Sequence, residues 1–176
     1  MPAKLLLVED PESRANDLPI REAVRAVVLD RHNRVLLFKA FPDNTRSRYF
    51  WITPGGGVAS GESATAALQR ELAEECGLLA AEIGPLIWVR DHVFPMPHSG
   101  QPMRQRERFY LVRVEQHEVD VSGWDDFERS FMGDHRWWTI DEVMASADEF
   151  APHRLARLLT DLVSGHIPKE PVDTGI

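Results

Sequence analysis

The sequence predicts a single α/β domain in which helices pack on a mixed β-sheet to form a sandwich. Three observations support this fold class. The chain has 176 residues and 43% of them are apolar, which suits one compact core and is short for two domains. Short apolar and β-branched segments follow one another along most of the chain. Helical patterns are scattered among them, an arrangement typical of helices that cover a sheet.

The first predicted unit is a β-hairpin. Residues 23–29 and 34–39 are mostly apolar or β-branched, and the polar stretch 30–33 between them indicates a turn. A polar loop at 42–48 then leads to a short strand at 49–52. This strand brings the chain to a run of glycines.

A helix is expected at 62–76, directly after the glycines at 55–57. Gly77 suits the left-handed backbone conformation that ends many helices, because glycine has no Cβ to clash there. Three further strands are expected at 86–93, 108–114 and 136–139.

A last helix is expected at 152–164, because its apolar residues recur at the spacing of one buried face and Gly165 suits its end. These residues are Leu155, Leu158, Leu159, Leu162 and Val163. We therefore place the domain at 21–165 and a C-terminal tail at 166–176. Residues 1–20 form an N-terminal arm of unassigned role, in which the apolar run 5–8 suits a short strand.

The composition limits the classes of function. A net charge of −8 disfavours general nucleic-acid binding, whose affinity rests on clustered Lys and Arg. A phosphorylated small molecule that binds together with a metal remains compatible. The sequence has neither an 18-residue apolar run nor a signal-peptide pattern, so we expect a cytoplasmic protein without a membrane partner. The lone Cys76 suits a small buried hydrophobe rather than a disulfide.

The helix at 62–76 carries an unusual cluster of carboxylates. At about 100° per residue, Glu75 falls between Ala64 and Leu68 on the apolar stripe, Glu71 lies beside it and Glu74 is one step further round. Like charges at these spacings destabilise a helix, and the cost rises when the groups are buried without partners. A solvated acidic face is the alternative, but such faces normally interleave Lys or Arg. We therefore predict a hard divalent cation here.

The spacing of this segment identifies a motif. Gly56 is followed after five residues by Glu62, and after seven more by Arg70-Glu71-Leu72, with the remaining specified positions at Glu74, Glu75, Gly77 and Leu78. The segment resembles the Nudix box over its 23 residues. Nine specified positions at fixed spacing make this a strong signal.

The resemblance implies an α/β/α sandwich and a hydrolase that cleaves a nucleoside diphosphate linked to another moiety, using Mg²⁺ or Mn²⁺. It assigns Glu74 and Glu75 as metal ligands and Glu71 as either a ligand or the base that polarises water. It also matches the main-chain carbonyl of Gly56 to a metal ligand. Divalent metal can screen phosphate charge, activate water and stabilise the leaving group. Arg70, which the resemblance places in the catalytic motif, and Glu62 are expected to brace the glycine loop rather than bind metal.

A further carboxylate is expected from a later loop, because relatives in this family often add one as a ligand or general base. The loop at 117–135 is rich in acids, and Glu128 lies about where such a residue would be expected. The alternative is an ordinary solvated loop acid.

Substrate contacts are expected from arginines and aromatic rings. Arg46 and Arg48 lie in the first loop, and Arg104, Arg106 and Arg108 lead into a strand, where the last two would share one face. A flat group such as a base could stack on Trp51, Phe50, Trp137 or Trp138. Because neighbouring residues of a strand alternate, at least one of Trp137 and Trp138 is expected in the core.

Two other functions share this fold: a module that binds nucleotide or protein without turnover, and a diphosphate isomerase. The complete set of motif glutamates argues against the first, and no additional acid–base groups support the second. The substrate stays open among nucleoside triphosphates, oxidised nucleotides, ADP-ribose and nucleotide sugars. The sequence does not assign an oligomeric state.

Overall fold

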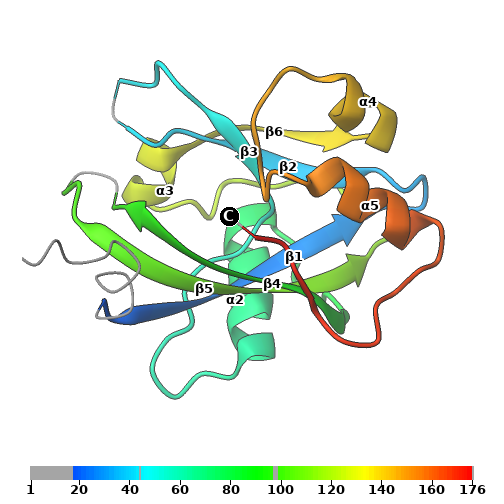
Figure 1. Cartoon of the computed structure of the whole chain (residues 1–176), viewed down its shortest axis with the longest axis horizontal. Coiled ribbons are helices and arrows are strands. Elements are labelled where there is room, and N and C mark those ends of the chain that lie inside the picture. The colour runs from blue at the N-terminus through cyan, green and yellow to red at the C-terminus, as the bar shows by residue number, and fades with distance from the viewer. Residues whose placement is uncertain (1–17, 44, 97–98, 176) are drawn as a thin grey trace, which may run out of the picture.

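One mixed β-sheet forms the centre of the computed structural model, which describes residues 18–43, 45–96 and 99–175 (Figure 1). The eight strands are β1 (Ile20–Leu29), β2 (Val35–Ala40), β3 (Phe50–Ile52), β4 (Ile83–Pro95), β5 (Pro102–Arg113), β6 (Met132–Trp138), β7 (Phe150–Ala151) and β8 (Val172–Asp173). Their order is β7-β3-β2-β1-β5-β4-β8, and β6 also pairs with β2. Parallel pairs (β1–β5, β3–β7 and β4–β8) stand among antiparallel ones.

The predicted hairpin is confirmed, but its two strands separate quickly. β1 pairs with β2 through Leu29 and Val35. Closer to the N-terminal end of β1, the glycine loop takes the place of β2. Here Val24 N donates to Gly56 O at 2.9 Å and Ala26 N donates to Pro54 O at 2.8 Å. The loop is therefore held along the edge of β1 by backbone hydrogen bonds.

Helix α2 (Ala64–Cys76) covers one face of the sheet. Its buried residues include Leu68, Leu72 and Cys76, which pack with the side chains of β1 and β2 that face this side. Ser63 caps its first turn by accepting from Ala66 N, and Gly77 ends it at φ 68°, as the sequence predicts.

The opposite face is covered by α4 (Ile140–Ala145) and α5 (Leu155–Val163). Four leucines of α5 are buried against strand residues such as Val27, Trp88 and Phe109: Leu155, Leu158, Leu159 and Leu162. Two separate apolar cores therefore lie on the two faces, and the predicted α/β/α sandwich with a mixed sheet is confirmed. Trp138 is buried in one core, as expected for at least one of the pair, and the partly buried Trp137 packs against the other core.

Several elements differ from the sequence-based expectation. The segment expected to be a loop at 117–135 contains a short helix, α3 (Asp126–Phe131), and the first residues of β6. After α5 the chain returns to the sheet, where β8 pairs with β4 and Thr174 N donates to Val89 O at 2.9 Å. These pairings depend on residues far apart in sequence, which local patterns do not encode. The short strand expected at 5–8 lies outside the described residues.

None of the helices in the described part of the chain is long and apolar enough to cross a membrane.

Candidate active site

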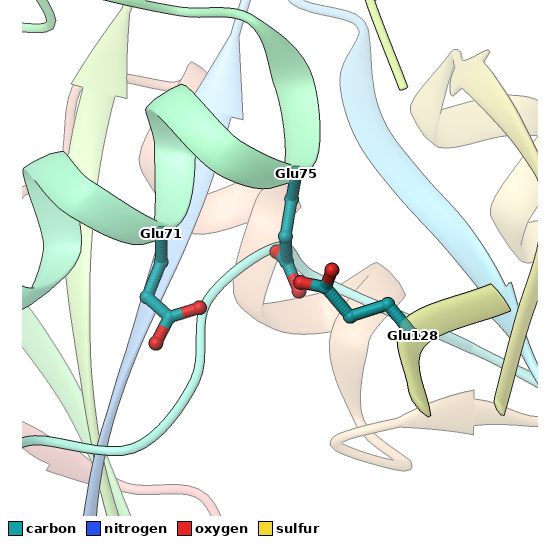
Figure 2. Close-up of side chains that lie close together, drawn as sticks. All are labelled: Glu71, Glu75 and Glu128. Atoms are coloured by element: carbon teal, nitrogen blue, oxygen red, sulfur yellow. The ribbon is translucent and has the colours of Figure 1, made fainter. Parts of the chain in front are cut away.

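Three carboxylates converge at the centre of the candidate site. Glu71 and Glu75 extend from α2, and Glu128 reaches toward them from α3 (Figure 2). One oxygen from each lies within 4.8 Å of the other two. Within the described part of the chain, no arginine or lysine forms a salt bridge with Glu75 or Glu128. Glu71 is paired with Arg70 at 2.8 Å, so two of the three carboxylates lack a direct cationic partner among the described residues.

Glu75 is the most deeply placed of the three and is 5% exposed. Burial raises the pKa of its carboxyl to about 8, against the opposing effects of Arg25 and of the hydrogen bond from Gly55 N at 2.6 Å. Its main chain is fixed as well, because Trp124 Nε1 donates to Glu75 O at 3.0 Å. A buried carboxylate with this pKa is poised to exchange its proton for a cation.

Glu71 lies directly over the glycine loop. A Cβ at Gly56 would come within 2.6 Å of its carboxyl atoms, so a larger residue at position 56 would displace the Glu71 carboxylate. Burial raises the pKa of Glu71, although Arg70 donates to it at 2.8 Å and opposes the shift. The expected carbonyl ligand, Gly56 O, accepts a hydrogen bond from Val24 N. If the Gly56 carbonyl oxygen also binds the metal, it would do so through its second lone pair.

Glu128 belongs to the first turn of α3, where it forms a reciprocal capping box with Asp125. Glu128 N donates to Asp125 Oδ1 at 2.8 Å, and Asp125 N donates to Glu128 Oε2 at 2.6 Å. Burial raises the pKa of Glu128, with Asp125 and the α2 glutamates contributing further. The structure thus brings Glu128 to the α2 carboxylates.

Glu74 stands apart from this group. Its side chain is 49% exposed, and its carboxylate faces Arg70 Nη1 at 3.4 Å. Arg70 also binds Glu62 at 2.9 Å and donates to Gly57 O at 3.0 Å. The hydrogen bonds that Glu62 accepts from Arg70 and from Ala59 N lower its pKa to about 2. Arg70 thus ties the helix to the glycine loop, in the bracing geometry expected for it.

Another buried acid, which the sequence analysis missed, lies on the sheet face opposite α2. Glu107 on β5 is 0% exposed and receives Arg25 Nε at 2.8 Å and Arg90 Nε at 2.6 Å. Burial alone would raise the pKa of Glu107, but Arg25, His92 and Arg90 outweigh it and hold the pKa well below its usual range. In the sequence Gln105 and Glu107 alternate with Arg104, Arg106 and Arg108, so no local apolar pattern marks Glu107 as buried.

Arg25 connects this acid to the glycine loop, since its Nη1 donates to Gly55 O at 2.6 Å. Arg21 lies two residues earlier on the same face of β1, and a Cβ at Gly57 would come within 2.9 Å of its guanidinium. Burial and the charge of Arg25 lower the pKa of Arg21, against the opposing charges of Glu71 and Glu107, and its Nη1 donates to Gln105 Oε1. The Arg21 guanidinium therefore lies at Gly57 of the glycine loop.

Most of the predicted substrate residues contact groups other than the three carboxylates. Arg106 and Arg108 share one face of β5, as expected, but both face Glu22, at 3.6 and 3.5 Å. Arg48 is exposed and lies 3.9 Å from Glu149. Arg46 packs against the end of α3. Trp51, for which a stacking role is predicted, is 5% exposed and packs edge-on against Trp138 in the core.

Comparison with known proteins decides the family. Residues 19–161 match the family model described as NUDIX domain. The chain belongs to the Nudix family. A protein named RNA pyrophosphohydrolase from Wolbachia pipientis subsp. Culex pipiens is 24% identical over 152 residues, covering 82% of this chain and 90% of the relative. One of the same name from Francisella philomiragia is 32% identical over 109 residues, covering 58% and 67%. The chain is accordingly a Nudix hydrolase of pyrophosphate bonds.

Solved structures support the same fold. The MutT protein from Methanosarcina mazei Go1 has a TM-score of 0.61 at 13% identity, covering 86% of this chain and 99% of that one. The E. coli dihydroneopterin triphosphate pyrophosphohydrolase has a TM-score of 0.59 at 16% identity, covering 81% and 95%. At these identities the likeness concerns the fold alone.

The residues present fit the divalent metal that Nudix hydrolases generally use. Three carboxylate oxygens close together, of which only the Glu71 carboxylate is paired with an arginine, form the donor set that hard cations such as Mg²⁺ and Mn²⁺ prefer. The glycine beneath Glu71 leaves the space that a larger side chain would fill.

Proposed function

We propose that this Nudix hydrolase cleaves the phosphoanhydride of a nucleoside diphosphate linked to another moiety, with Mg²⁺ or Mn²⁺ bound by Glu71, Glu75 and Glu128. The convergence of these three carboxylates carries the proposal. Glu74 and the carbonyl of Gly56 complete the set of candidate ligands. When bound, the cation would supply charge screening for the phosphates, a more acidic water and stabilisation of the leaving oxygen.

The side chains around the cation would activate the water, bind the phosphate and hold the site together. Glu128 comes from a separate helix and has a raised pKa, which suits it to accept a proton from the attacking water, while Glu71 is the alternative base. Arg21, beside Gly57, is placed to donate to a phosphate oxygen. Arg70 holds the loop and α2 in register through Gly57 and Glu62.

The substrate is proposed by class. Nucleoside triphosphates, oxidised nucleotides, ADP-ribose and nucleotide sugars all contain the required linkage. A second candidate is the 5′-triphosphate end of RNA, which is favoured by the similarity to proteins named RNA pyrophosphohydrolase. Only the terminal triphosphate of the RNA would need to enter the site. The net charge of −8, which disfavours binding along an RNA backbone, therefore does not oppose this candidate.

Product analysis tests the proposal. The protein is incubated with Mg²⁺ and each candidate, including a 5′-triphosphorylated oligoribonucleotide, and the products are identified by mass spectrometry in H₂¹⁸O. We expect cleavage of one class, ¹⁸O in a phosphate product, and loss of cleavage in excess EDTA or in Glu75→Gln. Full turnover in EDTA would falsify the metal assignment. Nucleotide binding without any product would favour the non-catalytic alternative.

A further inference from the structure

We propose that Arg46 is a positioning residue for Glu128, which it serves by clamping the C-terminal end of α3. The inference rests on the proposed role of Glu128 at the cation. It replaces the expectation from sequence that Arg46 contacts phosphate directly.

The contacts of Arg46 converge on the end of α3. Its Nη2 donates to Arg129 O at 2.7 Å and to Met132 O at 3.2 Å, with Ser130 O at 3.5 Å. Carbonyls at the last turn of a helix have no partners within the helix, and a cation there is stabilising. Arg46 therefore completes the hydrogen bonding of this helix end.

Phe41 joins Arg46 in this clamp. The guanidinium of Arg46 lies 4.5 Å from the centre of the Phe41 ring. Phe41 N donates to Phe131 O at 2.8 Å, and a Cβ at Gly133 would come within 2.7 Å of the Phe41 ring. The residues on both sides of the α3–β6 junction are thus held by one aromatic–arginine pair.

Helix α3 needs such support because it is short and shallow. It has six residues, none of them buried, and an isolated helix of this length is not stable in water. Its N-terminal cap uses the Glu128 carboxylate, which accepts from Asp125 N at 2.6 Å. Only Oε2 of Glu128 takes part in this cap, so the same short helix must hold the other oxygen toward a cation or a water. The clamp at the opposite end then holds the helix, and with it Glu128, in place.

The test compares Arg46→Ala and Arg46→Lys in the wild-type and Glu128→Gln backgrounds, using the best substrate of the panel above. We expect Arg46→Ala to lower kcat roughly 10- to 100-fold, with KM changed less than about threefold, since small misplacements of a reacting group cost this much. Arg46→Lys keeps one donor and should recover part of the loss. In the Glu128→Gln background, Arg46→Ala should have almost no further effect.

Hydrogen exchange gives a readout that does not depend on turnover. The amides of Arg129 and Ser130 should exchange about 10-fold faster in Arg46→Ala, because the helix end opens more often. Arg113→Ala is the control, because it removes an exposed arginine that contacts Asn33 at the C-terminal end of β5. It should change neither the exchange rates of Arg129 and Ser130 nor kcat.

Three results would overturn the proposal. An unchanged exchange rate would show that Arg46 does not hold α3. A raised KM at constant kcat, or an equal loss in both backgrounds, would show that Arg46 acts without Glu128. If Glu128→Gln itself keeps wild-type kcat, the role of Glu128 and the inference fail together, while Glu75→Gln still decides the metal site.

Discussion

Glu107 and Glu75 are both buried glutamates, yet their surroundings drive their pKa values in opposite directions. Two arginines from neighbouring strands neutralise Glu107 and hold its pKa low. Glu75 receives a backbone N–H but no arginine salt bridge within the described residues, and burial raises its pKa to about 8. The comparison distinguishes a carboxylate whose counter-ions are built into the sheet from one that is left for an external cation. The predictions below test this distinction.

The largest effect is expected from Glu75→Gln. Changing residues that only support a metal ligand costs about 10- to 100-fold, so losing the ligand should lower kcat by more than about 100-fold. Without metal, the buried Glu75 carboxyl stays protonated up to about pH 8, whereas the unfolded chain ionises above about pH 4.5, so the folded state loses stability as pH rises from 4.5 to 8. In EDTA at pH 8 the variant should therefore be the more stable protein. Steady-state rates and urea unfolding measure both effects. Near wild-type turnover would remove Glu75 from the metal site.

Glu107→Gln should behave in the opposite way, because it leaves Arg25 and Arg90 buried without their counter-ion. Breaking a buried ion pair costs about 3–5 kcal/mol, so the free energy of unfolding should drop by several kcal/mol at pH 7. Urea denaturation measures the loss. Stability equal to that of the wild type would mean that this network does not support the sheet.

The pH dependence of that loss provides a second check. The pKa of Glu107 is lowered on folding, so its ionised form stabilises the protein above the ordinary value of 4.5 and loses this effect as pH falls. The stability difference between wild type and Glu107→Gln should be constant above about pH 5.5. Below pH 4.5 it should shrink by about 1.4 kcal/mol per pH unit. A difference that does not change with pH would contradict the assigned charge state.

Stabilisation by bound metal should distinguish Glu75 from Glu107. At a Mg²⁺ concentration of 100 times Kd, the wild-type protein should gain about 2.7 kcal/mol. Glu107→Gln should retain this gain, because its carboxylate is not part of the cation site. Glu75→Gln should lose most of it. Differential scanning calorimetry in Mg²⁺ and in EDTA makes the comparison, and an equal gain in all three proteins would place the cation elsewhere.

The smallest effect on activity is expected from Glu74→Gln. The motif gives Glu74 and Glu75 equal standing, but in the structure Glu74 is half exposed and faces Arg70. We expect kcat to drop about 10-fold, as for a group that supports a ligand. Measuring kcat of Glu74→Gln and Glu75→Gln at the same Mg²⁺ concentrations ranks the two effects. If Glu74→Gln is as damaging as Glu75→Gln, the side chain of Glu74 turns toward the cation during catalysis.

Sequence by itself determined the features that are encoded locally. Backbone conformation and helical periodicity are set by neighbouring residues. They were enough to predict the glycine loop, helix α2, its end at Gly77 and the spacing of its glutamates. The hairpin and most strands followed from alternation and turn residues in the same way. The Nudix family also followed, because its motif is contiguous.

Only the tertiary structure decided which distant residues meet. Pairing of β1, β4 and β5 brings Arg25 and Arg90 onto Glu107, and folding of α3 brings Glu128 to α2. The sequence left Glu128 open between a loop acid and a site residue. It also assigned Arg46 to phosphate, because a charged side chain in a loop carries no local signal of its partner. Strand register and helix docking fix such partners, and they are set by packing across the whole sheet rather than by local pattern.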